Sequence, residues 1–182
     1  VDNVLKWVCE DVAALPSVSL DGKARQFDAQ SDNGMRGILV STDPPYYDNI
    51  GYADLSDFFY VWLRQSLRHT YPKLFSTMLV PKHEELVATP YREDRGKDGA
   101  RDFFEEGMFS TFKQVNKYVR EDVPVTIYYA FKQSETETKN DVESTASTGW
   151  ETMLSAIIRA GFSITGTWPM RTEMANRNIA SG

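Results

Sequence analysis

The feature that most constrains this chain is a short apolar run that two consecutive prolines bring to an end. Residues 37–42 are apolar or small, which is typical of a buried strand in a parallel sheet. Asp43 follows, and then Pro44 and Pro45, which have no backbone N–H to donate to a neighbouring strand. In open α/β sheets, ligands bind beyond the carboxyl ends of the strands. The sequence therefore predicts a functional loop directly after this strand.

Further strands and helices alternate along the 182 residues. Helical spacing of apolar residues predicts helices over residues 2–14, 54–69, 101–120 and 150–160. A run rich in β-branched and aromatic residues predicts a strand over residues 123–131, an alternating pattern predicts one over 162–170, and a short strand is expected over 24–29. This alternation favours a single α/β domain with a mainly parallel sheet. Charged or polar composition predicts mobile loops near residues 88–100 and 133–148.

An aromatic stripe lies on the predicted helix 54–69. Phe58, Phe59 and Trp62 recur at helical spacing on one face. We expect this stripe to be buried in the core, and the alternative is an exposed surface on which nucleic-acid bases stack.

The composition of the chain limits the cellular location and the binding partners that can be expected. The net charge is −6, whereas an isolated DNA-binding domain is usually basic, so this chain is not expected to bind DNA unaided. The single cysteine, Cys9, excludes an internal disulfide and a cysteine-based zinc site, and we predict no metal site. No apolar run is long enough for a membrane span and no signal peptide is recognisable, so a cytoplasmic location is expected.

The residue types after the strand suit chemistry on a planar amino group. In an amino group attached to an aromatic ring, the nitrogen lone pair is delocalised into the ring. Hydrogen-bond acceptors for the two amino hydrogens would make this lone pair available for reaction. Asp43 offers a carboxylate oxygen, Pro44 offers a carbonyl oxygen, and Tyr46 offers a flat face for an extruded base. The alternative is that the prolines only mark a turn after the strand.

Asp43-Pro44-Pro45-Tyr46 resembles the catalytic motif of the N6-adenine amino-methyltransferases. The wider stretch 41–59 is similar to the large prokaryotic adenine-specific DNA methylases that carry the DUF1156 domain, and so are residues 81–88, 128–133 and 167–173. The resemblance implies a Rossmann-like fold that uses S-adenosylmethionine as methyl donor. It also implies methyl transfer to adenine N6 in DNA and partners in a restriction or defence system.

The resemblance also assigns roles by position. The implied catalytic residues are Asp43, Pro44, Pro45 and Tyr46, the implied base contacts are Tyr46 and Tyr47, and the implied cofactor contacts are Asp28 and Asp43. In the family pattern, an acidic residue at the end of the preceding strand accepts a hydrogen bond from the adenine amino group of the cofactor. For Asp28, a cap of a turn is an equal alternative.

One departure from the family pattern concerns the glycines. None of the eleven glycines forms the Gly-x-Gly pair of the family's cofactor loop. We therefore expect the later part of a catalytic domain, without the first strand and the glycine-rich loop, and with most DNA contacts elsewhere. Methylation of an RNA base or another planar amino group, and a non-catalytic binding fragment, are the alternatives.

Overall fold

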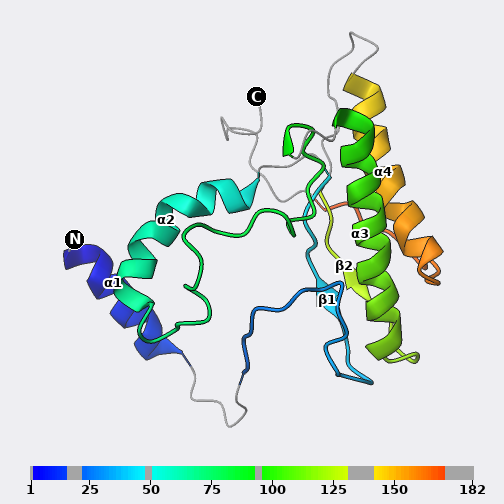
Figure 1. Ribbon diagram of the computed structural model, residues 1–182. Helices are drawn as coiled ribbons and strands as arrows, with labels where there is room; N and C mark the ends of the chain where they lie inside the picture. Colours follow the sequence, from blue (N-terminus) through cyan, green and yellow to red (C-terminus); the bar gives the residue numbers. More distant parts are fainter. Residues whose placement is uncertain (1, 16–21, 48–50, 93–95, 131–141, 171–182) are drawn as a thin grey trace.

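The computed structural model describes residues 2–15, 22–47, 51–92, 96–130 and 142–170 (Figure 1). The elements in chain order are α1 (Asp2–Ala14), β1 (Ser41–Thr42), α2 (Tyr52–Leu67), α3 (Gly96–Tyr118), β2 (Thr126–Ile127) and α4 (Val142–Arg159). The predicted mixture of helices and parallel strands is confirmed. In the described part of the chain, the sheet has two short strands.

β1 and β2 run parallel, with Ser41 opposite Thr126 and Thr42 opposite Ile127. The strands predicted over residues 37–42 and 123–131 are therefore real but much shorter than expected. The strands predicted over residues 24–29 and 162–170 are wrong, because neither segment forms a strand or pairs with another described segment. A strand-like sequence forms a strand only where a partner satisfies its backbone, and the described part of the chain offers no partner to these two segments.

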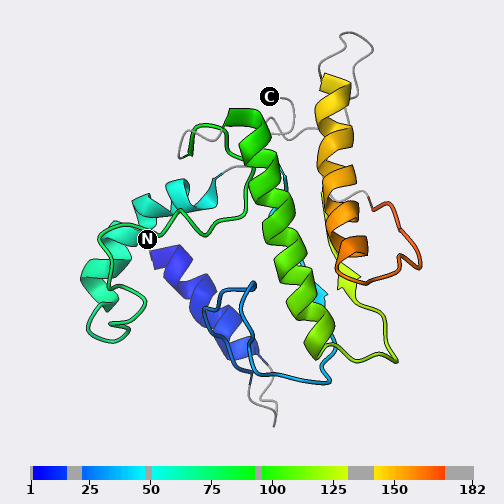
Figure 2. The same ribbon diagram turned by 45° about the vertical axis from the view of Figure 1, so that its right-hand side comes forward.

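The core lies where α3 and α4 pack side by side against the strands (Figures 1 and 2). Its largest fully buried side chains are Phe104, Met108, Phe112 and Met153. Gly107 lets α3 approach the preceding segment closely, since an added Cβ would lie 2.2 Å from Leu86 Cδ2. The predicted helix 101–120 thus carries its expected buried face.

Three helices begin earlier than predicted, α2 by two residues and the others by more. α3 starts at Gly96 and α4 at Val142, so residues 96–100 and 142–148 are helical rather than parts of loops. Ala100, in the added turn of α3, is buried. A helix with a buried face also propagates through neighbouring polar residues at little cost. Residues 93–95 and 133–141 of the predicted loops lie outside the described residues.

The aromatic stripe of α2 is exposed, so its predicted burial is wrong. Phe58, Phe59 and Trp62 keep 68%, 63% and 63% of their surface accessible. Figures 1 and 2 show α2 extending away from the α3–α4 pair. Helical periodicity shows that one face is apolar, but it does not show what covers that face. None of the described helices has the length and apolar character needed to cross a bilayer.

Candidate functional site

The proline loop, residues 43–47, follows β1 directly and lies at the carboxyl end of the strand, as predicted. The last strand residue, Thr42, accepts a hydrogen bond through its carbonyl from the backbone N–H of Tyr128 at 2.8 Å. The chain that follows β2 therefore runs beside the proline loop. Asp43 is exposed and Pro44 is partly buried.

Asp43 and Tyr46 lie together within the proline loop. The Tyr46 hydroxyl donates a hydrogen bond to Asp43 Oδ1 at 3.0 Å. The Tyr46 ring meets the ring of Tyr129 edge-on, with centroids 5.4 Å apart and an interplanar angle of 85°. The structure thus brings the predicted carboxylate and the predicted aromatic face into one place, on a loop that two prolines stiffen.

Tyr47 anchors the loop to the core. Its ring packs edge-on against Phe104 with centroids 5.2 Å apart, and its carbonyl accepts a hydrogen bond from the Ala88 N–H at 2.9 Å. Gly149 lies so close that an added Cβ would be 3.0 Å from Tyr47 Cβ. This placement favours an anchoring role for Tyr47 over the predicted contact with a base.

Tyr129 is the site residue that the sequence analysis missed. Its hydroxyl oxygen accepts a hydrogen bond from the Tyr47 N–H at 3.1 Å and lies 3.4 Å from the Gly149 carbonyl, to which it donates. Its ring stacks on Trp150, with centroids 6.2 Å apart. Residues that follow two paired parallel strands meet at one sheet edge, and that rule would have placed Tyr129 beside Tyr46.

Asp28 lies in a different setting from the one predicted. Its carboxylate caps a turn, because Oδ1 accepts the Gln30 N–H at 2.9 Å and Oδ2 accepts the Ser31 hydroxyl at 3.0 Å. The described residues before it, 2–15 and 22–27, contain no strand that it could end. Asp and Ser side chains compete for local backbone partners and so favour turns over strands. The structure therefore matches the turn-cap alternative.

A buried arginine holds the start of α2. Arg92, whose side chain is 11% exposed, pairs with Asp54 at 2.8 Å and with Glu85 at 2.7 Å. Glu85 Oε1 also accepts a hydrogen bond from the Ala53 N–H at 3.0 Å, which satisfies one of the free donors in the first turn. Burial lowers the pKa of Arg92, but the hydrogen bonds to Asp54 and Glu85 outweigh it and leave the pKa raised.

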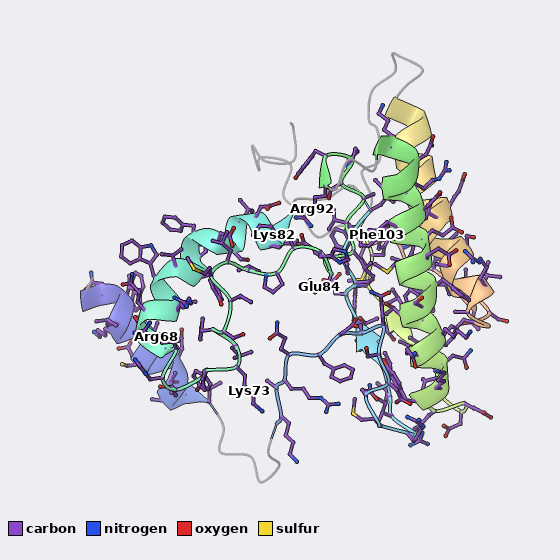
Figure 3. The ribbon with its side chains drawn as sticks, in the orientation of Figure 1. Arg68, Lys73, Lys82, Glu84, Arg92 and Phe103 are labelled. Atoms are coloured by element: carbon purple, nitrogen blue, oxygen red, sulfur yellow. The ribbon has the colours of Figure 1, made fainter. Side chains whose placement is uncertain are left out.

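A second ion pair fastens the same segment one turn further along α2. Asp57 lies 2.6 Å from the Lys82 ammonium and accepts a hydrogen bond from the Val80 N–H at 2.9 Å. Lys82 is labelled in Figure 3. The hydrogen bond from Lys82 holds the pKa of Asp57 below its usual range. The chain is thus fixed on both sides of the proline loop, by β1 before it and by the start of α2 after it.

Other expected contributors are not gathered at this site. Trp168, in the family-like stretch 167–173, is 80% exposed, and residues 171–173 lie outside the described part of the chain. Among the described residues, no group of three or more His, Cys, Asp or Glu side chains is arranged to hold a metal ion.

Comparisons with protein-family models, with characterised proteins and with solved structures gave no match to this chain. The assignment of a function therefore depends on the proline loop and its geometry.

Proposed function

We propose that the protein containing this chain transfers a methyl group from S-adenosylmethionine to the N6 amino group of adenine in DNA. One observation carries the proposal. A carboxylate (Asp43) and an aromatic ring (Tyr46) lie together on a proline-stiffened loop, at the carboxyl end of a strand in a parallel pair. That edge is where α/β folds bind their ligands.

The loop suits the activation of an amino group. Asp43 and the Pro44 carbonyl would accept the two hydrogens of the amino nitrogen, which draws the nitrogen toward tetrahedral geometry. The lone pair would then be available to bond the methyl group of a sulfonium donor, whose sulfur would keep the electron pair of the broken C–S bond, and the Asp43 carboxylate would take up the proton that the nitrogen releases. The Tyr46 ring would hold an extruded base by stacking, so that positioning and electrostatics provide the catalysis.

The methyl donor fits the described residues only in part. S-adenosylmethionine would supply a sulfonium methyl group. Of the two predicted donor contacts, Asp43 directly follows β1, whereas both carboxylate oxygens of Asp28 accept hydrogen bonds within its own turn. The chain also has no Gly-x-Gly pair. We therefore propose that this chain supplies the base-handling part of a Rossmann-like domain, and we assign no step to the donor.

The net charge of −6 favours an arrangement in which other parts of the protein supply most of the DNA contacts. Phosphate contacts supply much of the affinity of DNA-binding proteins, and they require basic side chains. We propose that basic surfaces elsewhere in the protein bind the duplex while the proline loop handles one base. A restriction or defence system is the setting that this activity suits.

The test is methyl transfer by the full-length protein and by its Asp43→Ala variant. We expect tritiated methyl from S-adenosylmethionine to enter duplex DNA, with N6-methyladenine as the product after digestion to nucleosides. Loss of Asp43 removes an acceptor for the amino hydrogens and should lower kcat about 10²- to 10⁴-fold. The matched control is Asp98→Ala, which removes a carboxylate that is 92% exposed in the first turn of α3.

The same assay shows which class of substrate receives the methyl group. Incorporation into RNA or protein but not into DNA would keep the chemistry and change the substrate. Wild-type activity in Asp43→Ala would refute the role of Asp43.

A non-catalytic assembly role is the second candidate, and the exposed stripe of α2 favours it. Phe58, Phe59 and Trp62 form an apolar surface of the kind found at protein interfaces. This alternative predicts no methyl incorporation by the wild-type protein, together with a self-association or partner contact that Phe58→Glu abolishes.

A further inference from the structure

We propose that Tyr129 is a positioning residue that holds the proline loop in place beyond the end of the sheet. This inference rests on the proposed function and adds to it a residue that the motif does not contain. It follows from the hydrogen bonds, the ring contacts and the burial around the Tyr129 side chain.

Backbone pairing with the neighbouring strand stops before this loop, and the backbone hydrogen bond from the Ala88 N–H to the Tyr47 carbonyl joins the loop to a different segment. The last backbone hydrogen bond of the strand pair joins the Tyr128 N–H to the Thr42 carbonyl at 2.8 Å. Pro44 and Pro45 have no N–H, so neither can donate to the neighbouring chain. The Tyr47 N–H, just beyond the prolines, donates to the Tyr129 hydroxyl at 3.1 Å. A side chain thus continues the link between the two strands where the backbone pairing stops.

The Tyr129 side chain is itself held by α4. Its hydroxyl donates to the Gly149 carbonyl at 3.4 Å, and its ring stacks on Trp150 at 6.2 Å. The next turn of α4 contains Met153, which is 1% exposed and belongs to the core. Tyr129 therefore connects the proline loop to a helix that core packing fixes.

The ring of Tyr129 also sets the orientation of the candidate base-stacking residue. It meets the Tyr46 ring edge-on at 5.4 Å, the arrangement that aromatic pairs favour. Tyr46 in turn donates its hydroxyl hydrogen bond to Asp43. The Tyr129 ring packs against Tyr46 and the Tyr129 hydroxyl accepts a hydrogen bond from the Tyr47 N–H, so one side chain contacts both tyrosines of the loop.

Tyr129→Phe separates these two effects, because it keeps the ring and removes the hydroxyl. The Tyr47 N–H then loses its acceptor, and the loop is free to shift relative to the bound base. Small misplacements of reacting groups cost large factors in rate. We expect kcat to fall about tenfold with the KM for DNA nearly unchanged, because phosphate contacts elsewhere dominate DNA affinity.

The experiment combines amide hydrogen exchange with steady-state kinetics. The exchange of the Tyr47 amide, kcat and KM are all measured in the full-length protein. Tyr129→Phe should speed exchange of the Tyr47 amide about three- to tenfold, the factor expected for one lost hydrogen bond. The matched control is Tyr128→Phe, whose ring is 52% exposed and precedes Tyr129 in the chain. It should leave both measurements unchanged.

The two measurements give distinguishable outcomes. Unchanged exchange of the Tyr47 amide in Tyr129→Phe would overturn the proposal whether or not the protein is a methyltransferase. Faster exchange with wild-type kcat would also overturn it, since the loop would then need no such support for the reaction. If the wild-type protein transfers no methyl group, the proposed function fails, while faster exchange still supports the hold of Tyr129 on the loop.

Discussion

Two phenylalanines that look alike in the sequence should differ sharply in what they contribute to stability. Phe58 and Phe104 both lie on apolar faces of predicted helices. In the structure, Phe104 is 0% exposed and packs against Tyr47, whereas Phe58 is 68% exposed. Replacing each by alanine therefore tests whether the α2 stripe is uncovered in solution.

The expected magnitudes follow from burial. Phe104→Ala removes a fully buried ring and leaves a cavity, which typically costs about 3–5 kcal/mol in the free energy of unfolding. For a chain of this size, that corresponds to a fall of roughly 6–20 °C in Tm. Full burial of a phenylalanine is worth about 1.5–3 kcal/mol, and Phe58 is only about one third buried. Phe58→Ala should therefore cost about 1 kcal/mol or less.

Urea denaturation followed by circular dichroism measures both values. Phe104→Leu keeps part of the buried side chain and should fall between wild type and Phe104→Ala, which guards against a variant that does not fold at all. Equal losses for Phe58→Ala and Phe104→Ala would refute the reasoning. Such a result would mean that another surface covers the α2 stripe in solution.

Two further predictions concern a close helix approach and a titrating turn. Gly107→Ala should lower the free energy of unfolding by about 1–3 kcal/mol in urea denaturation, because the added Cβ would clash with the buried Leu86 side chain, although alanine favours a helix more than glycine does. The double variant Gly107→Ala, Leu86→Ala should lose less stability than the sum of the two single variants. Full additivity of the two losses would contradict the clash. The Arg36 guanidinium and the Gly34 N–H lower the pKa of Asp32 from 3.8 to about 2, so the carboxylate stabilises the folded state above about pH 4 and this contribution is lost as the pH falls toward 2. NMR titration of the Asp32 carboxyl group should show this low midpoint, Arg36→Met should move it toward 3.8, and an unchanged midpoint would argue against the Arg36 hydrogen bonds.

The sequence predicts well those features that depend on local chemistry. The end of β1 at Asp43 follows from two residues without an N–H, and the helices follow from apolar spacing. The Asp28 turn was available as an alternative because an aspartate side chain can accept a hydrogen bond from the backbone that follows it, as it does here from the Gln30 N–H. These features need no knowledge of the remaining chain.

Features that depend on distant partners were harder to predict. The fate of the α2 stripe depends on whether another element packs over it, and Phe58 has no such cover among the described residues. The same holds for Arg92, which finds Asp54 and Glu85 only because an irregular segment folds back onto α2. Spacing along the chain carries no information about either contact.

The end of β1 after Thr42 and the chemistry proposed for the loop have one cause. A strand that runs into Pro44 and Pro45 must give up its backbone partner after Thr42, so the carboxyl end of the strand is open. That opening leaves the Pro44 carbonyl and the Asp43 carboxylate outside the backbone pairing, where they can accept hydrogens from another molecule. It also removes the hydrogen bonds that would otherwise fix their position. Tyr129 compensates from outside the motif, because its hydroxyl takes the Tyr47 N–H just beyond the prolines. Under the proposed function, a loop that is left open to accept hydrogens from a base is thus held in place by a side chain that follows the neighbouring strand.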